Sequence, residues 1–194
     1  SEGRPVAVVD ADIGQTDLGP PTTMAAADIT RHAVNLSEVE PSKRLFIGLT
    51  SPGLVKSKVI RGVKRLVACH AGQGKLVIVN TDGWVKGGEA VTYKVQMLNE
   101  INPDITLGIG SPGDVSEIVQ AGKRAAMLVS SPDTVRERDQ TDRRELRAAG
   151  YRKYLASSTM KTFQIGGVSL WGSLTPEPLK PRHFSRRELE ALKD

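Results

Sequence analysis

The chain has 194 residues, of which 39% are hydrophobic and 25% are charged, so its composition is that of a globular domain and excludes a disordered or fibrous chain. Its formal net charge of +5 favours polyanionic partners, because clustered Lys and Arg side chains attract phosphate groups. A single cysteine, Cys69, excludes an internal disulfide and a cysteine-based zinc site.

The first predicted element is a strand formed by the apolar run Val6-Ala7-Val8-Val9, which ends in Asp10-Ala11-Asp12-Ile13-Gly14-Gln15. A short β-branched run bounded by turn residues is typical of a buried strand in a parallel sheet. Ligands bind outside the carboxyl ends of the strands in open α/β sheets. We therefore expect Asp10, Asp12 and Gln15 to face a ligand crevice.

Strands and helices alternate along the rest of the chain. Residues 19–23 contain two prolines and a glycine and are predicted to form a loop. Further strands are predicted at 45–49, 76–80, 105–109 and 125–129, and helices at 56–71, 89–101, about 115–121 and 135–155. This alternation predicts an α/β fold, with helices on the faces of a mostly parallel sheet.

The predicted helix at 135–155 is crowded with arginine and has few apolar positions. A helix this polar either faces solvent or meets an anionic ligand. After it, residues 163–171 return to a β pattern, 175–181 form a proline-rich linker, and 186–193 are predicted to form a short helix. We therefore predict one domain over 1–174, followed by a linker and short helix over 175–194.

The two acidic residues after the first strand suit a magnesium site, because Mg²⁺ prefers oxygen ligands and keeps several waters. One carboxylate can also accept a proton from an attacking hydroxyl group, while Gln15 orients the nucleophile. The alternative is that acidic residues simply end strands and cap helices. The grouping of Asp10, Asp12, Gly14 and Gln15 favours the functional interpretation.

A matching phosphate loop would read G-x-x-x-x-G-K-[ST], and the 194 residues do not contain it. Gly72-Gln73-Gly74-Lys75 precedes a predicted strand instead of opening a helix, so it cannot present its amides to a phosphate, and we interpret it as a turn. We expect the missing strand, loop and helix to lie upstream, in a longer protein or in the other half of a complemented pair. The chain alone is then expected to be inactive.

Four features together resemble the P-loop polynucleotide 5′-hydroxyl kinase family, which includes RNA kinases of pre-mRNA cleavage, tRNA splicing and ribosomal RNA processing, with archaeal relatives. They are Asp10-Ala11-Asp12-Ile13-Gly14-Gln15, the turn Thr50-Ser51-Pro52, the string Asn80-Thr81-Asp82-Gly83-Trp84-Val85-Lys86-Gly87, and the arginine-rich helix. The resemblance runs in this order from the first strand to Leu155, and the string at 80–87 is its most specific element. It implies a P-loop NTPase-like three-layer fold whose first strand and phosphate loop are absent from this chain.

The resemblance also implies an activity and a set of site residues. The activity is phosphoryl transfer from ATP, or another nucleoside triphosphate, to the 5′-hydroxyl of RNA or DNA, with Mg²⁺ as cofactor. Asp12 is then the metal-linked base with Gln15 beside it, and the helix at 135–155 is a lid. The implied catalytic arginines are Arg138, Arg143 and Arg147; the implied substrate-binding residues are Thr50, Ser51, Trp84 and Lys86; and the implied cofactor-binding residues are Asp10 and Arg144.

Two other functions stay open on the sequence alone. One is a non-catalytic nucleotide-binding scaffold for RNA processing, and the other is a small-molecule P-loop kinase or synthetase. Trp84 can likewise be a purely structural residue that follows a strand. No signal-like start or bilayer-spanning apolar stretch is present, so we expect no membrane partner and a cytoplasmic protein, or a nuclear one if its source is eukaryotic.

Overall fold

A computed structural model describes residues 3–71, 74–131 and 138–162 of the chain. Ser1–Ala156 form one compact unit, which contains the functional site. Its strands are β1 (Val6–Ala11), β2 (Thr23–Ile29), β3 (Lys43–Phe46), β4 (Leu76–Thr81), β5 (Ile105–Ile109) and β6 (Ala125–Val129). Its α-helices are α1 (Lys56–Ala68), α2 (Gly88–Ile101), α3 (Pro112–Gln120) and α4 (Gln140–Leu155), and a 3-10 turn, η1, spans Leu36–Glu38.

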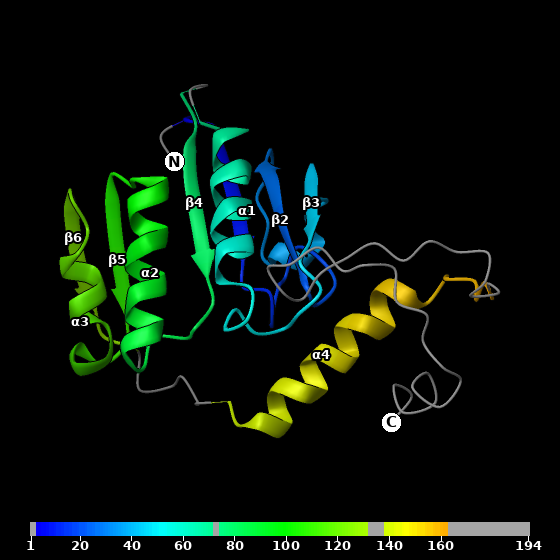
Figure 1. The fold of residues 1–194 in the computed structure, drawn as a ribbon. Coiled ribbons are helices and arrows are strands. Elements are labelled where there is room, and N and C mark those ends of the chain that lie inside the picture. Colours follow the sequence, from blue (N-terminus) through cyan, green and yellow to red (C-terminus); the bar gives the residue numbers. More distant parts are fainter. Residues whose placement is uncertain (1–2, 72–73, 132–137, 163–194) are drawn as a thin grey trace, which may run out of the picture. The chain divides into compact units, whose positions relative to one another are not determined.

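The strands form a four-stranded sheet in the order β3-β2-β1-β4 and a two-stranded sheet of β5 and β6 (Figure 1). The β1–β4 and β5–β6 pairs are parallel, whereas β2 runs antiparallel to both of its neighbours. The α/β prediction is therefore confirmed, with β2 as the exception to the parallel arrangement. Because β1, β3 and β4 point the same way, their carboxyl ends meet at one edge of the sheet.

Among the described strands, β2 is the one that the sequence did not predict. It begins at Thr23, the last residue of the predicted loop at 19–23, and continues through Met24-Ala25-Ala26-Ala27. Alanine has a low strand propensity, so this segment lacks the β-branched pattern that identified the other strands. The strand forms because these small residues are buried between β1 and β3, which is a tertiary effect.

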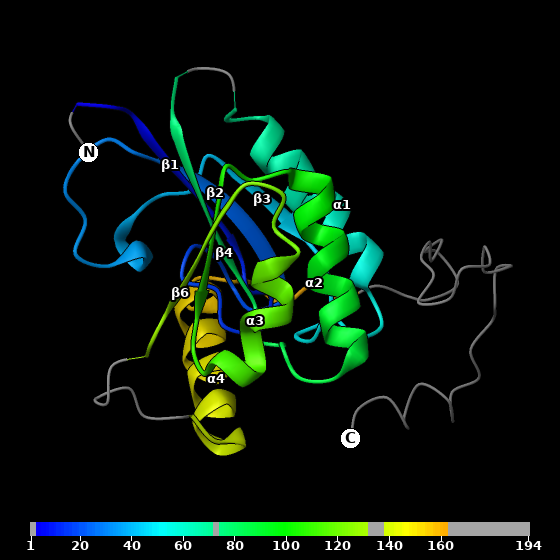
Figure 2. The same cartoon turned by 90° about the vertical axis from the view of Figure 1, so that its left-hand side faces the viewer.

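The main core lies between the sheet and the helices α1 and α2, which cover the same face of it (Figure 2). The helix α1 has apolar residues at spacings of three and four, and its Val59, Val63 and Leu66 are fully buried. A smaller cluster on β1 and β2 contains Val8, Ala25 and Ala27, and Leu18 covers it. These contacts fix the strands whose ends carry the site.

The edges of β4 and β5 face each other without pairing. Among the described residues, β4 pairs only with β1, and β5 only with β6. Strands of parallel sheets are normally buried on both faces, yet Ile78 is 50% exposed and Leu107 is 58% exposed. Within the described part of the chain, nothing forms over these apolar side chains the covering layer that parallel sheets normally have.

The arginine-rich helix α4 begins later than predicted, at Gln140. Asp139 caps it: the Asp139 side chain accepts a hydrogen bond from the Asp142 amide at 2.8 Å, and the Asp142 side chain accepts one from the Asp139 amide. No residue of α4 is buried. None of the described helices has the length and apolar composition needed to cross a membrane.

Several predictions concern residues outside the described part of the chain. They are the start of the helix at 135–137, the β pattern at 163–171, the linker at 175–181 and the helix at 186–193. The domain boundary after residue 174 also stays a prediction. Within the described part, Lys75 pairs with Asp28 at 2.9 Å, which is consistent with its interpretation as a turn residue and not a phosphate-binding lysine.

Candidate active site at the carboxyl edge of the sheet

Asp10 holds the loop that follows β1. Its side chain is fully buried and accepts five hydrogen bonds. The donors are the Asn80 side-chain amide at 3.0 Å, the Thr16 hydroxyl at 2.8 Å, and the backbone amides of Asp12 at 3.3 Å, Asp17 at 2.7 Å and Leu18 at 3.4 Å. Asp10, which was predicted to bind the cofactor, is therefore enclosed by protein and has no free surface for a ligand. Its role is to hold the loop that carries Asp12 and Gln15.

Asp12, two residues later, is placed differently, at the wall of a cleft. Its Oδ1 accepts hydrogen bonds from the backbone amides of Gly14 and Gln15, both at 3.0 Å. Burial raises the pKa of the Asp12 carboxyl; these two amides oppose the shift, and the neighbouring charges of Asp82 and Asp10 add to it. A carboxylate of raised basicity beside a cleft is suited to accept a proton.

The loop after β3 packs directly on the loop after β1. A Cβ at Gly14 would lie 2.8 Å from the backbone oxygen of Thr50, so only glycine lets the two segments come this close. Thr50 and Ser51 consequently line the same cleft as Asp12. The predicted substrate-binding turn and the predicted base are therefore neighbours.

A buried cluster holds the loop after β4. The Asp82 Oδ2 accepts a hydrogen bond from the Tyr93 hydroxyl at 2.9 Å, and its Oδ1 lies 3.2 Å from the Lys94 ammonium group. Lys94 also donates to the Asp82 backbone oxygen at 2.5 Å. Burial lowers the pKa of Lys94, while the Asp82 carboxylate pulls it in the opposite direction.

This cluster positions Trp84. The Trp84 amide donates to Asp82 Oδ1 at 3.1 Å, and the Trp84 ring stacks on the Tyr93 ring with centroids 5.8 Å apart. The Lys56 ammonium group also lies 5.8 Å from the centre of the Trp84 ring. Trp84 is half-buried and lines the cleft. The Tyr93 ring therefore supports the Trp84 ring, and the part of Trp84 that lines the cleft is accessible to a ligand.

The arginines at and before α4 form another wall of the cleft. Arg138 donates a hydrogen bond to the Gln15 side-chain oxygen at 2.6 Å, so two of the predicted catalytic residues are in direct contact. Arg143 and Arg147, one helical turn apart, also line the cleft. Arg144 is exposed and is not among the residues that line the cleft, so this structure does not bring it to the site.

The resulting cleft has a volume of about 1170 Å³. It unites nine residues predicted from the sequence: Asp12, Gln15, Thr50, Ser51, Trp84, Lys86, Arg138, Arg143 and Arg147. No cluster of three or more His, Cys, Asp or Glu residues suited to a metal occurs in the described residues. A carboxylate with one oxygen free of backbone bonds still fits Mg²⁺, which takes one or two carboxylates and completes its shell with phosphate oxygens and water.

Sequence reasoning missed the three residues behind Trp84. Asp82 belongs to the string at 80–87 but received no role, and Tyr93 and Lys94 were predicted only to lie in a helix. A lysine on an amphipathic helix is normally exposed, so its type and position give no signal of burial. The contacts of Tyr93 and Lys94 with Asp82 exist only in the folded protein, so the sequence alone could not assign these two residues a role.

The family described as the P-loop of the mRNA cleavage and polyadenylation factor CLP1 matches residues 1–157. The chain belongs to this family. The resemblance drawn from the sequence motifs is thereby confirmed, and the match covers every element from β1 to α4.

Curated proteins similar to this CLP1 P-loop chain include archaeal enzymes. The polyribonucleotide 5′-hydroxyl-kinase of Pyrococcus horikoshii is 25% identical over 173 residues, covering 89% of this chain and 48% of the relative. The enzyme of the same name from Thermococcus kodakarensis is 32% identical over 179 residues, covering 89% and 49%. A CLP1 homolog of Culex quinquefasciatus is 27% identical over 205 residues, covering 92% and 48%. The chain spans about half the length of these relatives.

Solved structures share the fold. One is a structure of the extended interface between Pcf11p and Clp1p, reported with the structural basis for ATP loss in a point mutant. It matches with a TM-score of 0.61 and 17% sequence identity, and the match covers 80% of this chain and 43% of that one. A wild-type Clp1p–Pcf11p complex matches with a TM-score of 0.56 and 14% identity over 78% and 42%. At these identities the similarity establishes the P-loop NTPase fold of Clp1 proteins and nothing finer.

The cluster behind Trp84 gives a stability prediction. Replacing Lys94 with Met leaves the buried Asp82 carboxylate without its cation, so we expect a loss of about 3–5 kcal/mol in the free energy of unfolding. The matched control is Lys64→Met, which breaks the exposed Lys64–Glu100 pair and is expected to cost at most about 1 kcal/mol. Denaturant unfolding followed by tryptophan fluorescence measures both, and equal costs for the two variants would contradict the assigned role of Lys94.

Proposed function

We propose that the complete protein containing this chain is an ATP-dependent polynucleotide 5′-hydroxyl kinase with RNA as its substrate. One observation carries the proposal: a single cleft unites Asp12 and Gln15 with the aromatic ring of Trp84 and with three arginines. Phosphoryl transfer needs a base, charge neutralisation and positioning of the acceptor, and these side chains supply all three. The kinase names of the archaeal relatives support the same activity.

In this mechanism Asp12 accepts the proton of the RNA 5′-hydroxyl as that oxygen attacks the γ-phosphorus of ATP in line with the leaving oxygen. The amides of Gly14 and Gln15 fix the orientation of the carboxylate. Gln15, itself held by Arg138, lies beside the acceptor oxygen. The raised pKa of Asp12 matches the task of a base better than that of an exposed carboxylate.

The arginines neutralise charge as it spreads over the transferred group. Planar guanidinium groups donate paired hydrogen bonds to phosphate oxygens, which suits Arg138, Arg143 and Arg147 to this role. When bound, Mg²⁺ would supply further charge neutralisation on the phosphates. Asp12 is the residue of the cleft that would hold it.

The substrate is gripped at its terminal nucleotide. An aromatic face stacks on any base with about 1–3 kcal/mol, which suits Trp84 to sequence-independent recognition. Thr50 and Ser51 line the same cleft as Trp84 and offer hydroxyl groups to the sugar and phosphate. Lys86 adds a positive charge at the rim, where it also lies 3.4 Å from Asp114.

We also propose that a segment outside these 194 residues supplies the phosphate loop, on a strand that pairs between β4 and β5. Both flanking strands belong to parallel pairs and expose apolar side chains, as expected for strands that lack a neighbour. A helix that follows such a strand would cover Ile78 and Leu107. The phosphates would then lie at the edge that carries Asp12, because phosphate loops sit at the carboxyl ends of their strands.

The activity is tested with Asp12→Asn in the complete protein. We expect transfer of labelled phosphate from ATP to a 5′-hydroxyl oligoribonucleotide to fall by at least about 10²-fold, because the general base is lost. RNA binding, measured by fluorescence anisotropy, is expected to stay within about twofold of wild type. Undiminished transfer in the variant would place the base elsewhere, and a wild-type protein that binds ATP without transfer would be the non-catalytic scaffold.

The added strand is tested in the same protein with Ile78→Asp and Leu107→Asp. If a strand and helix cover these positions, each charge is buried, and we expect a loss of at least about 2 kcal/mol in the free energy of unfolding. Leu54→Asp is the control, because Leu54 is 85% exposed and belongs to the loop after β3. Costs no larger than that of the control would show that nothing covers β4 and β5.

A further inference from the structure

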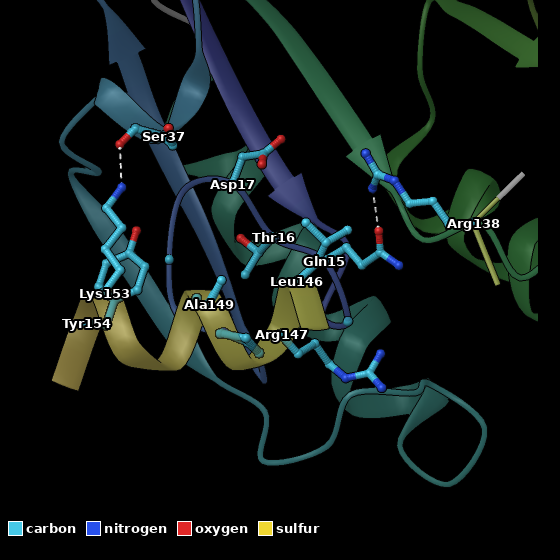
Figure 3. A pocket seen from close by; sticks show the side chains of 14 residues that line it. Gln15, Thr16, Asp17, Ser37, Arg138, Leu146, Arg147, Ala149, Lys153 and Tyr154 are labelled. Atoms are coloured by element: carbon cyan, nitrogen blue, oxygen red, sulfur yellow. Dashed lines mark hydrogen bonds between the residues drawn. The ribbon is translucent and has the colours of Figure 1, made fainter. Parts of the chain in front are cut away.

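A second, smaller pocket lies beside the cleft, between α4 and the loop that follows β1 (Figure 3). Its volume is about 360 Å³, at the lower end of the range for small-molecule sites. The residues found only in this pocket include Thr16, Asp17, Ser37, Ala149, Lys153 and Tyr154. None of them has a role in the proposed transfer reaction.

The pocket adjoins the cleft. Gly14, Gln15, Arg138 and Arg147 line both. The two sites therefore lie side by side, close enough for one extended ligand to occupy both. At the pocket, α4 packs closely on the loop after β1, since a Cβ at Gly150 would lie 3.1 Å from the Pro21 ring.

The pocket is lined by both positive and negative side chains. Arg138, Arg147 and Lys153 contribute three positive charges, and Asp17 contributes one carboxylate. Lys153 donates to the Ser37 backbone oxygen at 3.0 Å at one end, and Arg138 donates to Gln15 at the other, as Figure 3 shows. Asp17 lies between these two ends, with its amide bound to Asp10 at 2.7 Å.

We propose that this pocket binds the second nucleotide of the RNA substrate. The proposal rests on the proposed kinase function and names a subsite for it. Arg138, which lines both the cleft and the pocket, contacts the phosphate between the first two nucleotides, and Lys153, at the other end of the pocket, contacts the phosphate that follows. Asp17 accepts a hydrogen bond from the ribose 2′-hydroxyl.

The mixture of charges is the reason for assigning a sugar and its phosphates instead of a phosphate alone. A carboxylate repels a phosphate, so a pocket for a simple anion would not place Asp17 among its cations. A ribose between two phosphates needs positive charge at both sides and a hydroxyl acceptor in the middle, which is the order found here. The 2′-hydroxyl is the group by which a protein distinguishes RNA from DNA at a given position.

The test uses two substrates of the complete protein. A 5′-hydroxyl nucleoside 3′-monophosphate reaches only the cleft, whereas a 5′-hydroxyl trinucleotide also fills the second pocket. For Lys153→Gln we expect kcat/KM to fall about tenfold for the trinucleotide and to stay unchanged for the mononucleotide, because one charged contact is lost only with the longer substrate. Arg152→Gln is the matched control: it removes the same charge one residue earlier on α4, outside both pockets.

Two further variants address shape and sugar. Ala149→Trp fills the pocket and is expected to reduce the rate with the trinucleotide alone. A trinucleotide with a single 2′-deoxy sugar at its second position is expected to react more slowly than the all-ribose one with wild type, and equally fast with Asp17→Ala.

The outcomes separate the two proposals. If wild type phosphorylates both substrates but Lys153→Gln matches Arg152→Gln, the second-nucleotide site is overturned and the kinase function stands. The second-nucleotide site is likewise overturned if Asp17→Ala leaves the discrimination against the 2′-deoxy sugar intact. If wild type phosphorylates neither substrate, the kinase function and the subsite that rests on it both fail.

Discussion

The site depends on the burial of one charge, the Asp10 carboxylate at the end of β1. Its five hydrogen-bond donors come from β4 and from the loop at 12–18, so the carboxylate joins the sheet to that loop. A buried charge is tolerated only when such donors surround it. Any other arrangement of the loop would take these donors away from the buried carboxylate. This requirement fixes the positions of Asp12 and Gln15.

Asp82 has the same role on the neighbouring strand. It is buried, it is satisfied by Tyr93 and Lys94 from α2, and it fixes the loop that carries Trp84. The cleft thus lies between two loops that are each anchored by an enclosed carboxylate. The proximity of both charges adds to the effect of burial, which raises the pKa of Asp12, and the arginines on the α4 side line the opposite part of the cleft. Structure and proposed chemistry use the same three acidic residues in different roles.

The sequence allowed most strands, most helices and nine cleft residues to be predicted, because β-branched runs, helical periodicity and motif strings are local signals. It could not identify β2, whose alanines form a strand only through their neighbours. It also could not separate the roles of Asp10 and Asp12, which look alike in the chain. The difference arises from Asn80, 70 positions away, and from the turn at Thr16 and Asp17. The burial of Lys94 could not be predicted for the same reason, because burial is set by packing and not by residue type.

The most direct test of the anchoring role of Asp10 is the free energy of unfolding of Asp10→Asn, measured beside Asp12→Asn under identical conditions. An amide at position 10 turns a donor toward Thr16, Asp17 and Leu18, and so leaves buried donors unpaired. We predict a loss of at least about 2 kcal/mol for Asp10→Asn. Asp12→Asn is predicted to cost less than about 1 kcal/mol, because it keeps the oxygen that accepts from Gly14 and Gln15 and removes a charge beside two others. Equal costs for the two variants would contradict the claim that Asp10 anchors the site.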